Sequence, residues 1–177
     1  MTPHTEISRA AAPAPSPASP VRTFFSVHAA GAMFGLPVDA VQTIFRLQAI
    51  TPVPLGPPTV AGLVNLRGKI VTAISLARRL ALEGPDAKPA FAVAVECRGE
   101  TFALLVDAVG DAMECGPQDR LESPPHIDAR RARVTAASYR VENGIWPVLD
   151  VEALFDAAAI RAVETTQPVH SAPISEQ

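Results

Sequence analysis

The sequence is poor in aromatic residues, in cysteine and in any excess of charge. Aromatic residues make up 5% of the 177 residues, and 15 Lys and Arg residues stand against 18 Asp and Glu residues, for a formal net charge of -3. A nucleic-acid-binding protein usually carries a basic excess, so we expect no nucleic acid among the partners. No apolar run approaches the roughly 18 residues of a membrane-spanning helix, so we expect no direct insertion into a membrane.

Motifs for metal binding or catalysis are also missing. Cys97 and Cys115 lie far apart, without a C-x-x-C spacing or a nearby histidine pair, which favours buried free thiols over a disulfide framework or a zinc site. The histidines have no sequence partner typical of a ligand set or a catalytic pair. Neither a G-x-S-x-G nor an H-E-x-x-H motif is present. These absences weigh mildly against catalysis.

Both ends of the chain have the composition of disordered tails. The N-terminal stretch "AAAPAPSPASP" alternates Pro with Ala and Ser, a pattern that favours extended, solvated chain. It also lacks the apolar core of a signal peptide, so we expect a cytoplasmic protein. We therefore predict a tail over residues 1–20, one folded domain over 21–163 and a second tail over 164–177.

Between the tails, short apolar and β-branched runs alternate with turn signals. Hairpins are predicted where "HAAG", "RG", "RGE" and "ENG" each separate two such runs. A further strand is predicted in "AVQTIFRLQAITPVP", ended by its prolines. Turn signals about every 8 to 12 residues are typical of a β-barrel or sandwich, not of a parallel sheet with crossover helices.

Two helices are predicted beside these strands. "LARRLAL" (76–82) is followed by Gly84 and Pro85, which end helices. "VEALFDAAAIRAVE" (151–164) begins after Asp150, a natural N-cap. An apolar stripe along the second helix should pack against the barrel. Its members are Val151, Leu154, Phe155, Ala158 and Ala162.

One basic cluster falls outside these elements. "ARRARV" places Arg130, Arg131 and Arg133 in a predicted loop after "SPPHID". A solvated loop is the plain interpretation, and a contact with a partner is the alternative.

The central stretch "GLVNLRGKI" (62–70) invites comparison with a phosphate-binding loop. The Walker pattern has four residues between its first glycine and its Gly-Lys pair, whereas five separate Gly62 from Gly68. Ile70 stands where a Ser or Thr should hold magnesium, and no helix follows directly. We therefore reject a nucleotide site.

The same stretch fits two strands joined by a tight turn. Gly68 permits the positive φ that such a turn requires. Asn65 and Arg67 alternate with Leu66 and should point away from the core. An exposed arginine beside a rigid turn suits bidentate capture of a carboxylate.

Four stretches, in this order, resemble the CheW family, the adaptor proteins of bacterial chemotaxis arrays. They are "FSVHAAGAMFGLPVDAVQTI", "ITPVPLGPPTVAGLVNLRGKIVTAISLARRL" with "NLRG" at its centre, "FALLVDAVGDAME" and "GIWPVLDVEALF". The third resembles the family's second-barrel segment. Together they span about residues 22–156, nearly all of the chain predicted to be ordered.

The resemblance implies a mainly β fold of two five-stranded barrels, each like an SH3 domain, around a shared hydrophobic core. It implies no enzymatic activity and no cofactor. Such proteins couple the cytoplasmic tips of methyl-accepting chemoreceptors to a CheA-type histidine kinase, and they join rings with other CheW-like domains. It also implies recruitment to receptor arrays at the inner membrane. An adaptor of a divergent pathway such as that of a type IV pilus, a small-molecule-binding β-barrel and a regulatory domain of a larger kinase remain alternatives.

The resemblance also implies a receptor-binding face. In the family, the Asn and Arg of "NLRG" lie at this face, beside a strand similar to "VDAVQTI". The residues implied here are Val41, Thr43, Asn65, Leu66, Arg67 and Gly68. The sequence departs from the family at five positions: Thr43 where an acid is frequent, Thr72 where proline is usual, Ser75 where aspartate is usual, Ala77 where a basic residue is frequent and Ala137 where glycine is common. The departure at Thr43 bears on the choice of partner.

Overall fold

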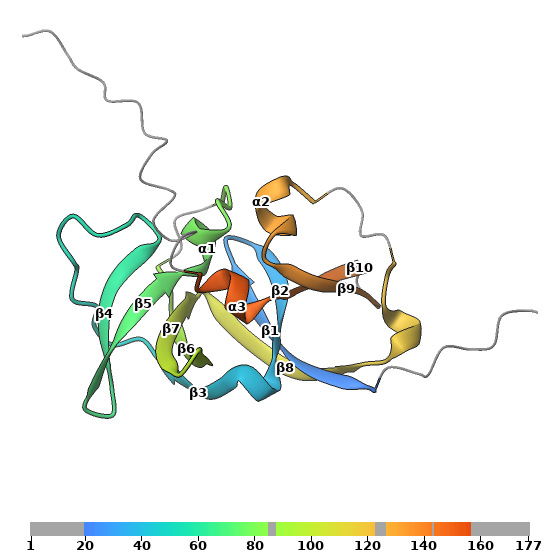
Figure 1. Ribbon diagram of the computed structural model, residues 1–177, viewed down its shortest axis with the longest axis horizontal. Coiled ribbons are helices and arrows are strands. Elements are labelled where there is room, and N and C mark those ends of the chain that lie inside the picture. Colours follow the sequence, from blue (N-terminus) through green and yellow to red (C-terminus); the bar gives the residue numbers. More distant parts are fainter. Residues whose placement is uncertain (1–19, 85–87, 123–126, 143, 157–177) are drawn as a thin grey trace, which may run out of the picture.

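A computed structural model describes residues 20–84, 88–122, 127–142 and 144–156. Within these ranges the chain forms two five-stranded sheets (Figure 1). The strands are β1 (Arg22–Ala29), β2 (Ala32–Pro37), β3 (Val41–Arg46), β4 (Val60–Leu66), β5 (Lys69–Ser75), β6 (Phe91–Cys97), β7 (Glu100–Val106), β8 (Ala108–Cys115), β9 (Thr135–Val141) and β10 (Gly144–Leu149). The short helices are α1 (Leu76–Arg79), α2 (Ala129–Ala132) and α3 (Val151–Leu154), with 3-10 turns at Val38–Ala40 and Pro117–Asp119.

Along the chain, the strands of one sheet lie between the second and third strands of the other sheet. The strand order β3-β6-β7-β5-β4 uses a continuous part of the chain, and we call this the inserted sheet. The order β8-β1-β2-β10-β9 joins the first two strands to the last three, and we call this the outer sheet. The two sheets form the two halves of the molecule in Figure 1. The predicted mainly β fold with two five-stranded units is confirmed.

The two sheets share a hydrophobic core. The largest buried cluster combines Leu36 and Leu149 of the outer sheet with Ile74, Val93 and Leu104 of the inserted sheet. Each sheet also has a buried cluster of its own. The cluster of the outer sheet contains Trp146, and the cluster of the inserted sheet contains Leu105. Because the central cluster belongs to both sheets, separating them would expose apolar surface of each.

The predicted hairpins are present. β1 pairs with β2, β4 with β5, β6 with β7 and β9 with β10, all antiparallel. Two other strand predictions were wrong. β3 ends at Arg46, well before the prolines, because its pairing with β6 ends at Phe91 and the chain then turns away as a loop. β8 was not predicted as a separate strand; the chain changes sheets at Asp107, so "FALLVDAVGDAME" belongs to both sheets.

The helix predictions were correct in place but not in length. α1 ends at Arg79 because Ala81 adopts a φ of +48°, so the helix stops before Gly84.

The basic cluster that was predicted to lie in a loop forms a short helix instead. Arg130 and Arg131 belong to α2, and Arg133 caps its end. The N-cap is Asp128, whose Oδ1 accepts hydrogen bonds from the backbone N–H groups of Arg130 and Arg131. These hydrogen bonds lower the pKa of the Asp128 carboxyl, and the bond from the Arg131 N–H has the larger effect.

A buried arginine ties the inserted sheet to the end of α3. The Asp150 side chain caps α3 as predicted, and residues 157–164 of the predicted helix lie outside the described residues. Arg79 is only 6% exposed and donates from Nε to the carbonyl of Leu154 (2.9 Å) and from a terminal nitrogen to that of Ala153 (2.8 Å). Burial lowers the pKa of this guanidinium, but arginine remains charged at neutral pH. Arg79 therefore satisfies carbonyls that a helix end leaves unpaired.

Replacing this arginine should destabilise the fold. Arg79→Met keeps an apolar stem but leaves two carbonyls without donors, so we expect the free energy of unfolding to fall by about 2 to 4 kcal/mol. Arg78→Met changes the exposed neighbour on the same helix and should stay within about 0.5 kcal/mol of wild type. Urea titration followed by circular dichroism measures both. Equal stability of the two variants would contradict the role of Arg79.

The cysteines should be unreactive in the folded protein. Both are free and buried, and burial raises the pKa of the Cys97 and Cys115 thiols, so less reactive thiolate forms near neutral pH. Dithionitrobenzoate at pH 8 should label neither thiol of the native protein over minutes and both in guanidinium chloride. Rapid labelling of the native protein would show that the thiols become exposed without global unfolding.

Candidate functional site

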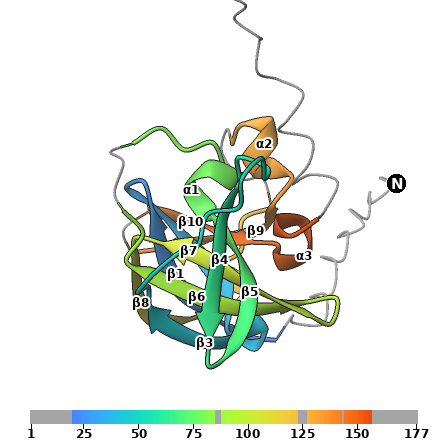
Figure 2. The same cartoon turned by 90° about the vertical axis from the view of Figure 1, so that its left-hand side faces the viewer.

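A groove runs between the two edge strands of the inserted sheet. β3 and β4 stand at opposite ends of the strand order, so neither pairs with the other along its length. Figure 2 views the molecule from the side of this sheet. The space between the strands has a volume of about 570 Å³. Its lining consists of Thr43, Ile44, Phe45, Arg46, Leu47, Gln48, Ala49, Val64, Asn65, Leu66 and Arg67.

The groove is closed at one end by backbone pairing. Thr51 and Leu63 donate N–H groups to each other's carbonyls, at 2.9 and 2.8 Å. Past this pair the two segments separate, and Ala49 and Asn65 face the opening from opposite sides. Since a strand alternates its hydrogen-bonding direction at every residue, the backbone N–H and C=O of Asn65 point the same way as those of Leu63, into the groove.

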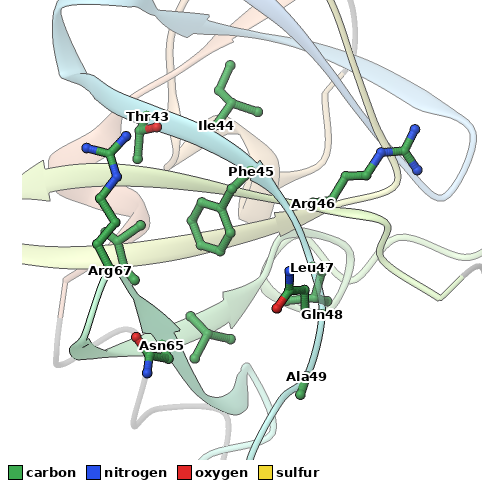
Figure 3. A pocket seen from close by; sticks show the side chains of 11 residues that line it. Thr43, Ile44, Phe45, Arg46, Leu47, Gln48, Ala49, Asn65 and Arg67 are labelled. Carbon is green, nitrogen blue, oxygen red and sulfur yellow. The ribbon is translucent and has the colours of Figure 1, made fainter.

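The floor of the groove is apolar and firmly supported. Phe45, Leu47 and Leu66 are partly buried and pack on the buried cluster of the inserted sheet, which includes Val64. Figure 3 shows Phe45 and Leu47 extending from the β3 side. A floor that rests on a close-packed core keeps its shape, so binding to it requires little reorganisation.

The turn beside the groove holds Arg67 in a fixed, strained position. Arg67 and Gly68 have φ values of +52° and +88°, which is the left-handed conformation of a two-residue hairpin turn. Asn65 Oδ1 accepts a hydrogen bond from the Gly68 N–H at 2.7 Å. Asn65 therefore has a structural role that the sequence did not reveal, and its amide nitrogen remains as a donor at the groove.

The charge in the groove is of one sign. Two arginines and no Asp or Glu occur among the residues that line it. Within the described ranges, Arg67 makes no hydrogen bond or ion pair, and its guanidinium extends toward the strand that carries Thr43 (Figure 3). The guanidinium of Arg46 lies 5.4 Å from the centroid of the Phe91 ring and points away from Arg67. Among the described residues that line the groove, Arg67 is thus the cation whose guanidinium has no partner.

The structure brings most of the predicted interface together. Thr43, Asn65, Leu66 and Arg67 all line the groove, and Gly68 completes the adjacent turn. Val41 does not line it, because its side chain packs against the core shared by the two sheets. The α2 arginines lie by the outer sheet, away from β3 and β4, and Arg131 is paired with Asp128 at 2.9 Å (Figure 1).

Several lining residues were not predicted from the sequence. They are Ile44, Phe45, Arg46, Leu47, Gln48, Ala49 and Val64. One signal was available: no charged residue occurs between Arg46 and Arg67, although much of that segment is an exposed loop. An uncharged segment that is long and partly exposed indicates a surface for contact with another molecule.

Neither a membrane-crossing helix nor a metal site is evident in the described part of the chain. None of its helices has the length and apolar character needed to cross a membrane. Within the same residues, no three His, Cys, Asp or Glu side chains are grouped so that they could hold a metal ion.

Comparison with known proteins identifies similar sequences and similar solved structures. The sequence model of the CheW-like domain matches residues 23–159. The chemotaxis protein CheW of Treponema pallidum is 24% identical over 135 residues, which are 73% of this chain and 79% of the relative. The probable chemotaxis protein CheW of Rhizobium etli is 27% identical over 124 residues, 69% and 79% of the two chains. The crystal structure of the scaffolding protein TtCheW from Thermoanaerobacter tengcongensis superposes with a TM-score of 0.70 at 22% identity, covering 78% of this chain and 95% of that one.

Relief of the strain at Arg67 should stabilise the hairpin. Asparagine adopts left-handed φ values more readily than arginine, so Arg67→Asn should raise the free energy of unfolding by about 0.5 to 1 kcal/mol. The turn between β6 and β7 supplies a matched control, since Arg98 and Gly99 have φ values of +52° and +80°. Arg98→Asn should give a similar gain in thermal or urea unfolding. A loss at Arg67 with a gain at Arg98 would show that Arg67 makes stabilising contacts in the free protein.

Proposed function

The chain belongs to the CheW-like domain family, and from this premise we propose that it is a non-catalytic adaptor that couples chemoreceptors to a CheA-type histidine kinase in a chemosensory array. The similar proteins from Treponema pallidum and Rhizobium etli are described as chemotaxis proteins. The observation that carries the proposal is the groove between β3 and β4, where the "NLRG" turn, an apolar floor and an unpaired arginine meet. An adaptor needs such a preformed surface, and it needs no reacting group.

The groove is suited to hold a helix of a receptor's cytoplasmic tip. An amphipathic helix binds by placing its apolar face into a hydrophobic groove, while polar groups at the rim set its position. Here Phe45, Leu47 and Leu66 provide the apolar contact, and Thr43 and Asn65 provide polar groups at the rim. Binding is then an association of preformed surfaces, with no covalent step.

Arg67 contributes to this association to the extent that the partner covers it. An ion pair that stays exposed is worth about 0 to 1 kcal/mol, because water and salt screen it. An arginine at the desolvated centre of an interface can be worth about 2 kcal/mol or more. We propose that the receptor helix covers Arg67, which makes this residue a main determinant of affinity.

The kinase and other CheW-like domains require a second surface. The outer sheet lies on the other half of the molecule from the groove, so a partner there would leave the groove free for a receptor (Figure 1). Arg130 and Arg133 remain candidates for such a contact, because they are exposed beside this sheet, whereas Arg131 is already paired with Asp128. In this proposal the protein acts in the cytoplasm and is recruited to arrays at the inner membrane.

Charge reversal at the two equivalent turns tests the adaptor role. Arg67→Glu should abolish capture of a chemoreceptor tip fragment from the same organism, while Arg98→Glu, on a turn with the same backbone conformation, should leave capture unchanged. Both variants should melt within a few degrees of wild type by circular dichroism, since each changes an exposed side chain. Capture is measured by pull-down with the purified CheA-type kinase present and absent. Unchanged capture by Arg67→Glu, or no capture by wild type, would refute the proposal.

A further inference from the structure

We infer that the groove selects a partner segment bearing a carboxylate, which Arg67 binds, and that Thr43 determines this selectivity by leaving Arg67 unneutralised. The inference rests on the proposed receptor groove and adds the chemistry of its occupant. It follows from the polar groups that face the groove and from what burial would do to them.

The residues that line the groove include no negatively charged group that could neutralise a buried arginine. Its other polar side chains are Thr43, Gln48 and Asn65, which are all uncharged, and Arg46 adds a second positive charge. The carbonyl oxygen of Asn65 already accepts the Gly68 N–H, so this side chain contributes its amide donor to the groove. Glu96, on the strand next to β3, accepts a hydrogen bond from Gln42 at 2.7 Å. Positive charge therefore predominates where the partner would lie.

Covering Arg67 without a counter-charge would be strongly unfavourable. A guanidinium loses its water when a helix is placed over it, and an unpaired buried charge costs far more than the apolar contacts around it provide. In the free protein Arg67 is exposed and makes no ion pair with any described residue. The partner must then bring the carboxylate, and a planar carboxylate fits the two parallel N–H donors of a guanidinium.

The fixed turn makes this recognition specific. The left-handed backbone at Arg67 and the hydrogen bond from Gly68 to Asn65 fix the root of the side chain relative to the floor. A partner carboxylate must therefore lie at one position relative to its own apolar stripe. A segment with the same apolar stripe and no acid at that position would leave Arg67 buried and unpaired, and would bind weakly.

Thr43 sets this requirement because it stands across the opening from Arg67. The guanidinium extends toward the strand that carries Thr43 (Figure 3), and both residues line the same groove. A carboxylate at position 43 would pair with Arg67 inside the protein and compete with the partner's acid. Threonine has no charge, so the groove of this chain requires an acidic partner.

Calorimetric titration of the purified 177-residue chain with a chemoreceptor tip fragment from the same organism tests the inference. Thr43→Glu should weaken binding about tenfold or more, because a newly paired Arg67 no longer binds the partner's carboxylate. Thr43→Gln has the same shape without the charge and should stay within about threefold of wild type. The affinity of wild type should fall with added salt more steeply than that of Arg67→Gln.

A charge exchange identifies the acid on the partner. Among fragments with single Glu→Arg or Asp→Arg changes, one should regain affinity for Arg67→Glu and lose it for wild type, which a purely structural role of Arg67 would not produce. Equal affinities of Thr43→Glu and Thr43→Gln, or the absence of a compensating partner variant, would overturn the inference. If wild type still bound the fragment in that case, the adaptor role would stand. No binding by wild type would instead refute the adaptor role itself.

Discussion

The packing of the two sheets against one another is the constraint on which the rest of the molecule depends. The central cluster takes side chains from both sheets, so each sheet completes the hydrophobic core of the other. Arg79 reinforces this arrangement at its margin, where it joins α1 to the carbonyls that end α3. The groove is rigid for the same reason, because its apolar floor packs on the buried cluster of the inserted sheet.

Local chemistry explains which parts of the fold could be predicted from the sequence. The hairpins were predictable because a glycine in a two-residue turn, as at Gly68 and Gly99, acts within a few residues of the strands it joins. β8 was missed because most of its side chains are exposed and its residues lack the alternation that marks a half-buried strand. The length of β3 was overestimated because only its pairing with β6 determines where it ends.

The groove could be predicted only in part, for a related reason. Asn65, Leu66 and Arg67 lie on one turn, so the motif that contains them was visible in the sequence. Phe45 and Leu47 were missed because an apolar residue at an open seam between strands has the same pattern as one in a core. Val41 was assigned to the interface from its neighbours, although strand geometry directs its side chain into the shared core. Which residues face one another across the gap is decided by the curvature of the sheet.

The position of the inserted sheet in the sequence, between strands of the outer sheet, has a consequence for biosynthesis. β3 to β7 are consecutive in the chain, so the inserted sheet can form on the ribosome as soon as they emerge. β1 and β2 are made before these strands, yet their own sheet is complete only when β9 and β10, near the opposite end of the described chain, have been made. During that interval the apolar side of the early hairpin has only the inserted sheet to cover it. Completion of the outer sheet by β9 and β10 therefore controls when this part of the nascent chain ceases to be a target for chaperones and for aggregation.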